Sequence, residues 1–225
     1  MADLKSGKCN YCDKIVNKSG IKKHIAACKE EKSTQQGVPS HEKTKYFHLM
    51  VDGKYSPEYW LYLDVKSTTK LKALDDFLRQ IWLECCGHLS AFRIRDQTYS
   101  SYPDKSFGDR SMNYKLEDLM GEGMIFGYEY DFGTTTELNL KVTSESEGKS
   151  RRKAIEVMAR NTAPDVRCSA CGKIATQVCA QCIWENKGWL CDKCGEVHKC
   201  GEEMLLPVVN SPRVGMCGYT GNGMI

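Results

Sequence analysis

Thirteen cysteines and five histidines are the residues of this 225-residue sequence whose types and spacing point to chemistry. Three cysteines lie between residues 9 and 28, two are adjacent in the middle of the chain, and eight lie between residues 168 and 217. Most of them form Cys-x-x-Cys pairs, and a two-residue gap lets one tight turn present two thiolates to a single metal ion. A disulfide framework is the alternative. The odd count and a polar start without an apolar signal segment instead favour reduced, metal-binding thiols in a cytoplasmic protein.

The first group of ligand types has the spacing Cys9-x2-Cys12-x11-His24-x3-Cys28, which is close to that of zinc fingers. Residues four positions apart lie on one face of a helix, so His24 and Cys28 can bind the same ion. A unit of about twenty residues buries too little surface to fold alone, and metal binding must therefore supply its stability. We predict a zinc finger in residues 1–32, with Zn²⁺ bound by these four side chains.

The second group lies in the C-terminal region and has the spacing Cys168-x2-Cys171-x7-Cys179-x2-Cys182-x8-Cys191-x2-Cys194-x3-His198-x-Cys200. Eight ligands suffice for two tetrahedral Zn²⁺ ions, and with every position filled by protein the zinc would be structural. Alternating pairs predict a cross-brace, similar in spacing to B-box modules. Its two ligand sets would be Cys168, Cys171, Cys191, Cys194 and Cys179, Cys182, His198, Cys200. A sequential order of the pairs is the alternative, and Cys217 is a ninth candidate that could replace Cys200.

The middle of the chain holds the adjacent cysteines Cys85 and Cys86. Neighbouring cysteines rarely bind one ion, so we expect this pair to be an unliganded end of a helix. The sequence therefore predicts three zinc ions, one from the N-terminal group and two from the C-terminal group.

Catalytic candidates in the middle of the chain are His48, His88, Glu129 and Asp131. Their spacing shows no triad and no paired acids. Glu129 and Asp131 fit the solvent-facing side of a strand, and His88 fits a residue that interacts with the carbonyl groups at a helix end. We therefore assign no catalytic residue.

The net charge of +3 is unevenly distributed. Residues 1–32 hold eight lysines and four acidic residues, so the positive excess lies at the N-terminal end. Lys14, Lys18, Lys22 and Lys23 can neutralise nucleic-acid phosphates, but the predicted helix lacks the Arg, Asn or Gln side chains that distinguish bases. The finger also resembles small Cys/Cys/His/Cys fingers that bind ubiquitin, and purely structural capping is a third alternative. The near-neutral C-terminal module favours a protein partner.

Hydrophobic patterns between the two ligand groups predict an α+β domain. Alternating or β-branched and aromatic segments predict strands at 46–51, 59–65, 91–95, 124–132 and 138–142, the last two as a hairpin. Apolar residues that step by three and four predict a helix over 70–85: Leu71, Leu74, Leu78, Ile81 and Cys85. Its start is marked by the hydroxyls of Ser67-Thr68-Thr69 and its end by Gly87. The hairpin places Glu129 and Asp131 toward solvent.

These elements resemble the plasmid pRiA4b Orf-3-like family over residues 45–143. The resemblance depends on residues 57–60, on residues 88–94 and above all on the run Phe126-Gly127-Tyr128-Glu129-Tyr130-Asp131-Phe132-Gly133. Family members typically continue this run with an Asp, a Trp and a His, whereas this chain has Thr134-Thr135-Thr136-Glu137. The resemblance implies a compact α+β domain, often found in mobile-element or uncharacterised microbial proteins, without a settled activity.

The chain is thus divided into five parts. They are a zinc finger (1–32), a linker (33–45), the α+β domain (46–143), a polar connector (144–164) and the two-zinc cross-brace module with its tail (165–225). Apolar residues make up 41% of the sequence and charged residues 27%, which is typical of globular proteins. The sequence has no run of 18 apolar residues, so we expect no membrane span.

These features favour a zinc-binding, non-catalytic adaptor that binds nucleic acid or a protein, in a mobile-element or regulatory context. The alternative is a nucleic-acid-processing enzyme with its active site in the central domain. A deep pocket lined by converging acids and histidines would favour the enzyme. A flat basic surface continuous with the finger lysines would favour binding.

Overall fold

A long, mostly antiparallel sheet is the framework of the fold. The computed structural model describes residues 6–33 and 43–221, and within them ten strands form one sheet. In spatial order these are β2 (Ile15–Asn17), β1 (Ser6–Cys9), β10 (Ile155–Asn161), β4 (Trp60–Lys66), β3 (Lys43–Gly53), β9 (Thr136–Lys149), β8 (Ile125–Tyr130), β5 (Ser90–Ile94), β6 (Gln97–Ser100) and β7 (Arg110–Ser111). Strands β6 and β7 are parallel, and the other neighbouring pairs are antiparallel.

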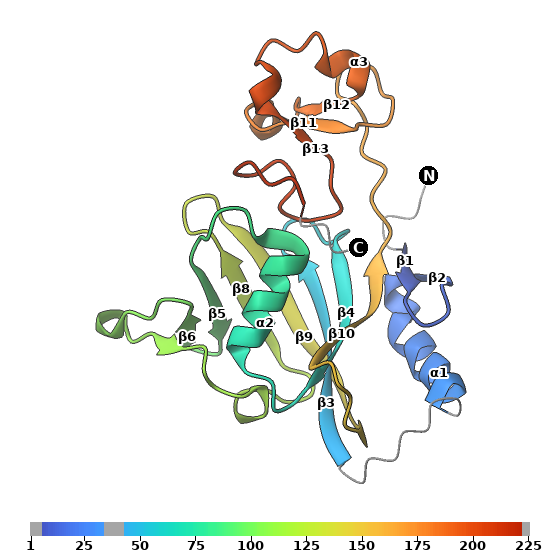
Figure 1. Ribbon diagram of the computed structural model, residues 1–225, viewed down its shortest axis with the longest axis vertical. Helices are drawn as coiled ribbons and strands as arrows, with labels where there is room; N and C mark the ends of the chain where they lie inside the picture. Colours follow the sequence, from blue (N-terminus) through green and yellow to red (C-terminus); the bar gives the residue numbers. More distant parts are fainter. Residues whose placement is uncertain (1–5, 34–42, 222–225) are drawn as a thin grey trace.

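Helices cover both faces of this sheet, and Figure 1 shows α2 lying across one of them. Helix α2 (Leu71–Leu78) continues into the wider π-helical turn η2 (Arg79–Leu83), and α1 (Ile21–Ser33) packs on the opposite face. The other short helices are η1 (Lys18–Gly20), η3 (Lys105–Phe107), η4 (Leu116–Asp118), η5 (Cys182–Glu185), α3 (Asp192–Gly195) and η6 (Glu202–Met204). Among the described residues, no helix has both the length and the apolar composition needed to span a membrane.

Strand β4 shows that both faces of the sheet are covered. Its first six residues are all buried. Leu61 and Leu63 belong to the cluster under α2, whereas Trp60 and Tyr62 belong to the cluster under α1. Successive side chains of a strand point to opposite faces, so a strand without polar alternation is expected where each face is packed against a helix.

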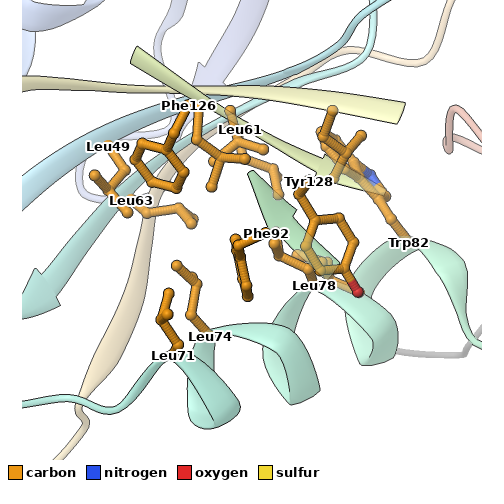
Figure 2. Packing of buried hydrophobic residues seen from close by; sticks show 14 of the residues in the cluster. Leu49, Leu61, Leu63, Leu71, Leu74, Leu78, Trp82, Phe92, Phe126 and Tyr128 are labelled. Carbon is orange, nitrogen blue, oxygen red and sulfur yellow. The ribbon is translucent and has the colours of Figure 1, made fainter. Parts of the chain in front are cut away.

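The larger core lies between α2 and the sheet. Leu71, Leu74 and Leu78 are fully buried and step along one face of the helix, as the sequence predicts. Figure 2 shows them directed toward the sheet, with Phe92 and Tyr128 close by. Burying a leucine side chain contributes roughly 1.5–3 kcal/mol, so this face accounts for much of the attachment of α2.

Helix α2 begins differently from the prediction. The residue at its N-cap is Lys70, which makes no side-chain capping hydrogen bond, so the expected hydroxyl cap is absent. The amides of Leu71 and Lys72 instead donate to the carbonyl groups of Tyr114 and Met112, at 3.0 and 2.9 Å. A neighbouring loop therefore satisfies the free N–H groups of the first turn, a long-range solution that local sequence does not indicate.

Residues 144–164, expected to form a polar connector, are largely sheet. Strand β9 continues to Lys149 and β10 follows at Ile155, where it pairs with β4 on one side and with β1 on the other. The second half of β9 is half-exposed, and its ladder uses backbone groups, so its polar composition gave no strand signal. The predicted linker, residues 33–45, lies mostly outside the described residues, and its last three residues begin β3.

The hairpin of β8 and β9 is present, but at its turn Asp131 and Phe132 have orientations opposite to those that strand alternation predicts. Asp131, expected to face solvent, is 5% exposed, and Phe132 is 50% exposed. Strand β8 ends at Tyr130, and Asp131 has a φ of 65°. A left-handed residue interrupts the alternation of a strand, and the carboxylate therefore turns inward.

The C-terminal module has a separate sheet in the order β12 (Trp189–Leu190), β11 (Gln177–Cys179) and β13 (Leu205–Pro207). Figure 1 shows it beyond one end of the large sheet. The chain then returns to the central domain, where Ser211 Oγ donates to the Trp82 carbonyl at 2.6 Å. At Gly215 the backbone lies close to the module, since a Cβ atom added there would be 2.7 Å from Ile183. The final segment, residues 208–221, therefore contacts both the central domain and the C-terminal module.

Candidate metal centres

Four clusters of cysteine and histidine side chains in the described part of the chain could each hold a metal ion. In every cluster the four candidate ligand atoms lie within 4.8 Å of one another. With Zn–S bonds of about 2.3 Å, the sulfur atoms around a tetrahedral zinc lie roughly 3.8 Å apart. The four clusters therefore have the dimensions of closed metal sites, one more than the sequence predicts.

The first cluster contains the four residues of the predicted finger, Cys9, Cys12, His24 and Cys28. Cys9 ends β1, Cys12 follows in a tight turn, and the other two lie on α1. The turn is closed by the Asp13 amide, which donates to the Cys9 carbonyl at 2.9 Å, and Asp13 has a φ of 61°. Cys12 Sγ lies 3.3 Å from His24 Nε2, so the turn and the helix meet at the ligand atoms.

The finger is built into the central sheet. Strand β1 pairs with β10 through residues 7–9. A Cβ at Gly7 would lie 2.3 Å from a ring atom of Trp60, so the absence of a side chain lets the strand approach. Ile21 and Ile25, each 1% exposed, pack in the same cluster as Trp60. The finger thus covers one face of the central domain.

The eight predicted C-terminal ligands form two clusters, grouped in the cross-brace order. One contains Cys168, Cys171, Cys191 and Cys194, and the other contains Cys179, Cys182, His198 and Cys200. The sulfur atoms of Cys171 and Cys191 are 3.6 Å apart. Cys182 Sγ lies 3.5 Å from both Cys200 Sγ and His198 Nε2. Each cluster therefore draws on ligand pairs separated along the chain, and a bound ion would tie them together.

Backbone amides prepare two of these thiols for metal binding. Burial opposes ionisation of Cys168, but hydrogen bonds from the amides of Cys191 and Ala170 lower its pKa to about 6. Against the same effect of burial, the amide of Cys182 helps to lower the pKa of Cys179 to about 7. The thiolate is the form that binds metal, so these amides favour the ligand state at Cys168 and Cys179. Hydrogen bonds with neighbouring thiols have the opposite effect on their cluster partners, and raise the pKa of Cys182 and of Cys194 to about 12.

The fourth cluster joins Cys85, Cys86 and His88 to Cys217. The Cys85-Cys86 pair, expected to be an unliganded helix end, therefore lies with two further candidate ligands. One of them is Cys217, which the sequence offered as an alternative to Cys200. Three of the four residues lie in the run Cys85-Cys86-Gly87-His88, which is a local signal for this site. The fourth follows His88 by 129 positions, and such a distance carries no local pattern.

Two of the four lysines considered for phosphate binding contact the central domain. Lys18 Nζ forms an ion pair with Asp52 at 2.6 Å, and Lys22 Nζ donates to the Thr143 carbonyl at 2.7 Å. Lys14, Lys22 and Lys23 are exposed. Of the four ammonium groups, that of Lys18 is therefore the one neutralised by an acidic side chain of the central domain.

The four catalytic candidates occupy three different places. Glu129 pairs with Arg93 across β8 and β5 at 3.1 Å, and His48 on β3 lies 3.0 Å from a serine hydroxyl of β9. His88 and Asp131 lie together at the fourth cluster, with 3.5 Å between Nδ1 and Oδ1. Each side chain thus has a partner that accounts for its position.

A groove of about 960 Å³ lies between β1, β10, η2 and the final segment. Its lining includes the cations Lys8, Lys153 and Arg160 over the apolar side chains of Ile155 and Val157. The four catalytic candidates are not among its lining residues. The condition set for a catalytic centre, converging acids and histidines, is therefore not met by this groove.

A comparison with known protein families matches the central domain and the start of the C-terminal region. The family model described as plasmid pRiA4b ORF-3-like protein matches residues 46–175, more than half of the chain, and the chain belongs to this family. The match runs past residue 143 and includes β10, in line with the pairing of β10 and β4.

One similar solved structure is the crystal structure of a protein of unknown function, MM3350, from Methanosarcina mazei Go1. The two chains are 18% identical with a TM-score of 0.45, over 52% of this chain and 69% of that chain. No curated protein matches the chain.

Proposed function

We propose that this protein is a non-catalytic zinc adaptor whose C-terminal two-metal module binds a protein partner. The proposal depends on one contrast. The N-terminal finger adds strands to the central sheet and covers one of its faces. The C-terminal module reaches the central core only through side chains such as Val178 and Ile183, keeps a sheet of its own, and leaves Trp184 and Val197 exposed.

The choice of zinc follows from the donor set. The candidate ligands in the clusters are thiols and imidazoles, without carboxylates, and four such ligands at tetrahedral spacing favour Zn²⁺. The S–S distances of 3.5–3.6 Å in the C-terminal clusters are close to the edge of a zinc–sulfur tetrahedron. Four protein ligands leave no position for substrate, so the ions would be structural.

The partner surface is assigned to the neighbourhood of the Cys179, Cys182, His198 and Cys200 cluster. Trp184 is 64% exposed and follows Cys182 by two residues, and Val197 is 80% exposed and precedes His198. Aromatic side chains are enriched at protein interfaces, and charged residues are depleted from the centres of such surfaces.

Charge favours a protein over a nucleic acid as this partner. Residues 165–204 carry five basic and six acidic residues, which gives no attraction to phosphate. At the other end of the chain, Lys18 and Lys22 already bind Asp52 and the Thr143 carbonyl. The finger therefore offers fewer free cations than its sequence suggests.

The test is affinity capture with the full chain, using lysate of the source cells with and without nuclease. The variant Trp184→Ala removes the exposed aromatic ring, and Phe107→Ala is a matched control because Phe107 is 84% exposed on the central domain. We expect a captured protein that survives nuclease and binds the control, and that is lost with Trp184→Ala.

Two results would contradict this function. One is a bound species that nuclease releases and that Trp184→Ala retains. The other is turnover of a nucleic-acid substrate by the purified protein, which would support the enzyme alternative.

A further inference from the structure

The fourth cluster connects segments from opposite halves of the chain. Cys85, Cys86 and His88 lie in the loop between η2 and β5, and Cys217 lies 131 positions after Cys86. Cys86 Sγ is 3.7 Å from both Cys85 Sγ and Cys217 Sγ. The Nε2 atom of His88 lies 3.0 Å from Cys86 Sγ and 3.2 Å from Cys217 Sγ. These separations approach those around a tetrahedral ion with three sulfur ligands and one nitrogen ligand.

We propose that Cys85, Cys86, His88 and Cys217 bind a further Zn²⁺ ion, which fastens the final segment of the chain to the central domain. The inference shares its choice of metal with the proposed function but needs no partner. Its ligand set, Cys₃His, is typical of structural zinc sites.

The surroundings of His88 orient it as a metal ligand. Its Nδ1 atom lies 3.5 Å from Asp131 Oδ1, while its Nε2 atom faces the sulfur atoms. Zinc-binding histidines commonly use the second ring nitrogen to bind a carboxylate, which fixes the ring and strengthens the ligand. The left-handed backbone at Asp131 turns this carboxylate inward, toward the histidine.

A buried arginine holds both the carboxylate and one thiol. Arg213 is fully buried, and its Nη2 atom lies 2.6 Å from Asp131 Oδ2 and 3.5 Å from Cys85 Sγ. Its Nη1 atom donates to the Thr134 carbonyl at 2.7 Å. An arginine beside a thiolate offsets part of the negative charge of a three-cysteine site. Arg213 comes from the same final segment as Cys217, so the segment supplies both a ligand and its support.

Backbone conformation at Cys217 also indicates a function. Its φ is 46°, a left-handed value that is unfavourable for a non-glycine residue, and its side chain is exposed. The contacts of its sulfur atom are with Cys86 and His88, the other candidate ligands. A ligand bond would compensate for the strain of this backbone conformation.

The ion would also affect the C-terminal module. Gly215, two residues before Cys217, packs against Ile183 and Val178 of the module. Ser211 and Arg213 bind the central domain through Trp82 and Asp131. A metal bond at Cys217 would therefore close the segment that fixes the module against the central domain.

The experiment is native mass spectrometry of the full chain, purified with reductant, to count zinc ions. We expect four in the wild type and three in the double variant Cys86→Ser with Cys217→Ser, which leaves only two ligands at the site. Thr220→Ala, an exposed change three residues after Cys217, is the matched control and should keep four.

Hydrogen exchange gives the second measurement. The amides of Met216 and Tyr219 donate to the carbonyl groups of Arg213 and Met216, at 3.1 and 2.8 Å. Their exchange should accelerate in the double variant, while the amides of β4 should remain protected.

The comparison of wild type and double variant decides the proposal. A zinc count that is above zero and the same in wild type and double variant would overturn the fourth site. A loss of one zinc with unchanged exchange in residues 213–219 would overturn its fastening role. Zinc absent from all the proteins would instead refute the zinc assignment of the proposed function.

Discussion

The two ends of the chain use the same ligand chemistry for different structural purposes. The finger contributes β1 to the large sheet and covers one of its faces with α1, whereas the C-terminal module has a sheet of its own beyond the end of the central domain. Ligand spacing therefore predicts where a metal can bind but not what the bound unit does. That depends on which apolar surfaces the unit shares with its neighbours.

The largest expected difference concerns loss of a metal ligand at either end. Structural zinc binds finger peptides with a free energy of roughly 10–16 kcal/mol, and the free energy of unfolding of a whole domain is roughly 5–15 kcal/mol. Cys28→Ser should therefore expose the Trp60 face and abolish the cooperative melt of the central domain. Cys194→Ser should unfold the C-terminal module and leave that melt in place.

Circular dichroism and hydrogen exchange on the full chain check this prediction. Amides of β4 and β10 report on the central domain, and amides of β11 report on the module. Equal loss of protection in both variants would show that the two ends do not differ in this way.

The next largest effect is expected for the apolar face of α1. Ile25→Ala removes a side chain that is 1% exposed and packs in the cluster with Trp60. Such truncations lower the free energy of unfolding by about 2–5 kcal/mol. Ile15→Ala, on β2 with 60% exposure, should change the free energy of unfolding by less than about 0.5 kcal/mol. Urea titration measures both, and similar values would mean that the finger is not a cover of the sheet.

A smaller effect is expected from the close approach of β1 to the Trp60 ring and to β10. Gly7→Ala would place a Cβ 2.3 Å from the Trp60 ring and 2.5 Å from the Arg160 carbonyl. Overpacking of this kind costs about 1–3 kcal/mol. Gly20→Ala is the control, because its Cβ would meet Val16 at 3.9 Å, an ordinary contact. A thermal melt of Gly7→Ala that matches this control would argue against tight docking of the strand.

The smallest effect is expected from the exposed lysines. Lys14→Ala and Lys23→Ala should leave affinity for oligonucleotides, and its salt dependence, almost unchanged, since the finger serves to cover the sheet. Titrations of duplex and single-stranded oligonucleotides at several salt concentrations measure this. A fall in the salt slope of about one per lysine would show phosphate contacts and would give the finger a binding role.

Local patterns were sufficient for much of the fold. Apolar steps predicted the buried face of α2, and alternation predicted the β8–β9 hairpin, because both periodicities follow from backbone geometry. Strand β10 was missed, since its pairing with β1 and β4 involves residues about 90 to 150 positions away. The inward turn of Asp131 was missed because one left-handed residue reverses a strand pattern.

Local spacing alone predicts the closely spaced ligand pairs of both groups, because a tight turn or one helical turn sets the distance within each pair. Only long-range packing shows how the four C-terminal pairs combine and which zinc-binding unit adds its strands to the central sheet. Packing also brings Cys217 to Cys85, Cys86 and His88. Neighbours in sequence are held together by covalent geometry at little further entropic cost. Ligands 131 positions apart meet only after packing has ordered the chain between them.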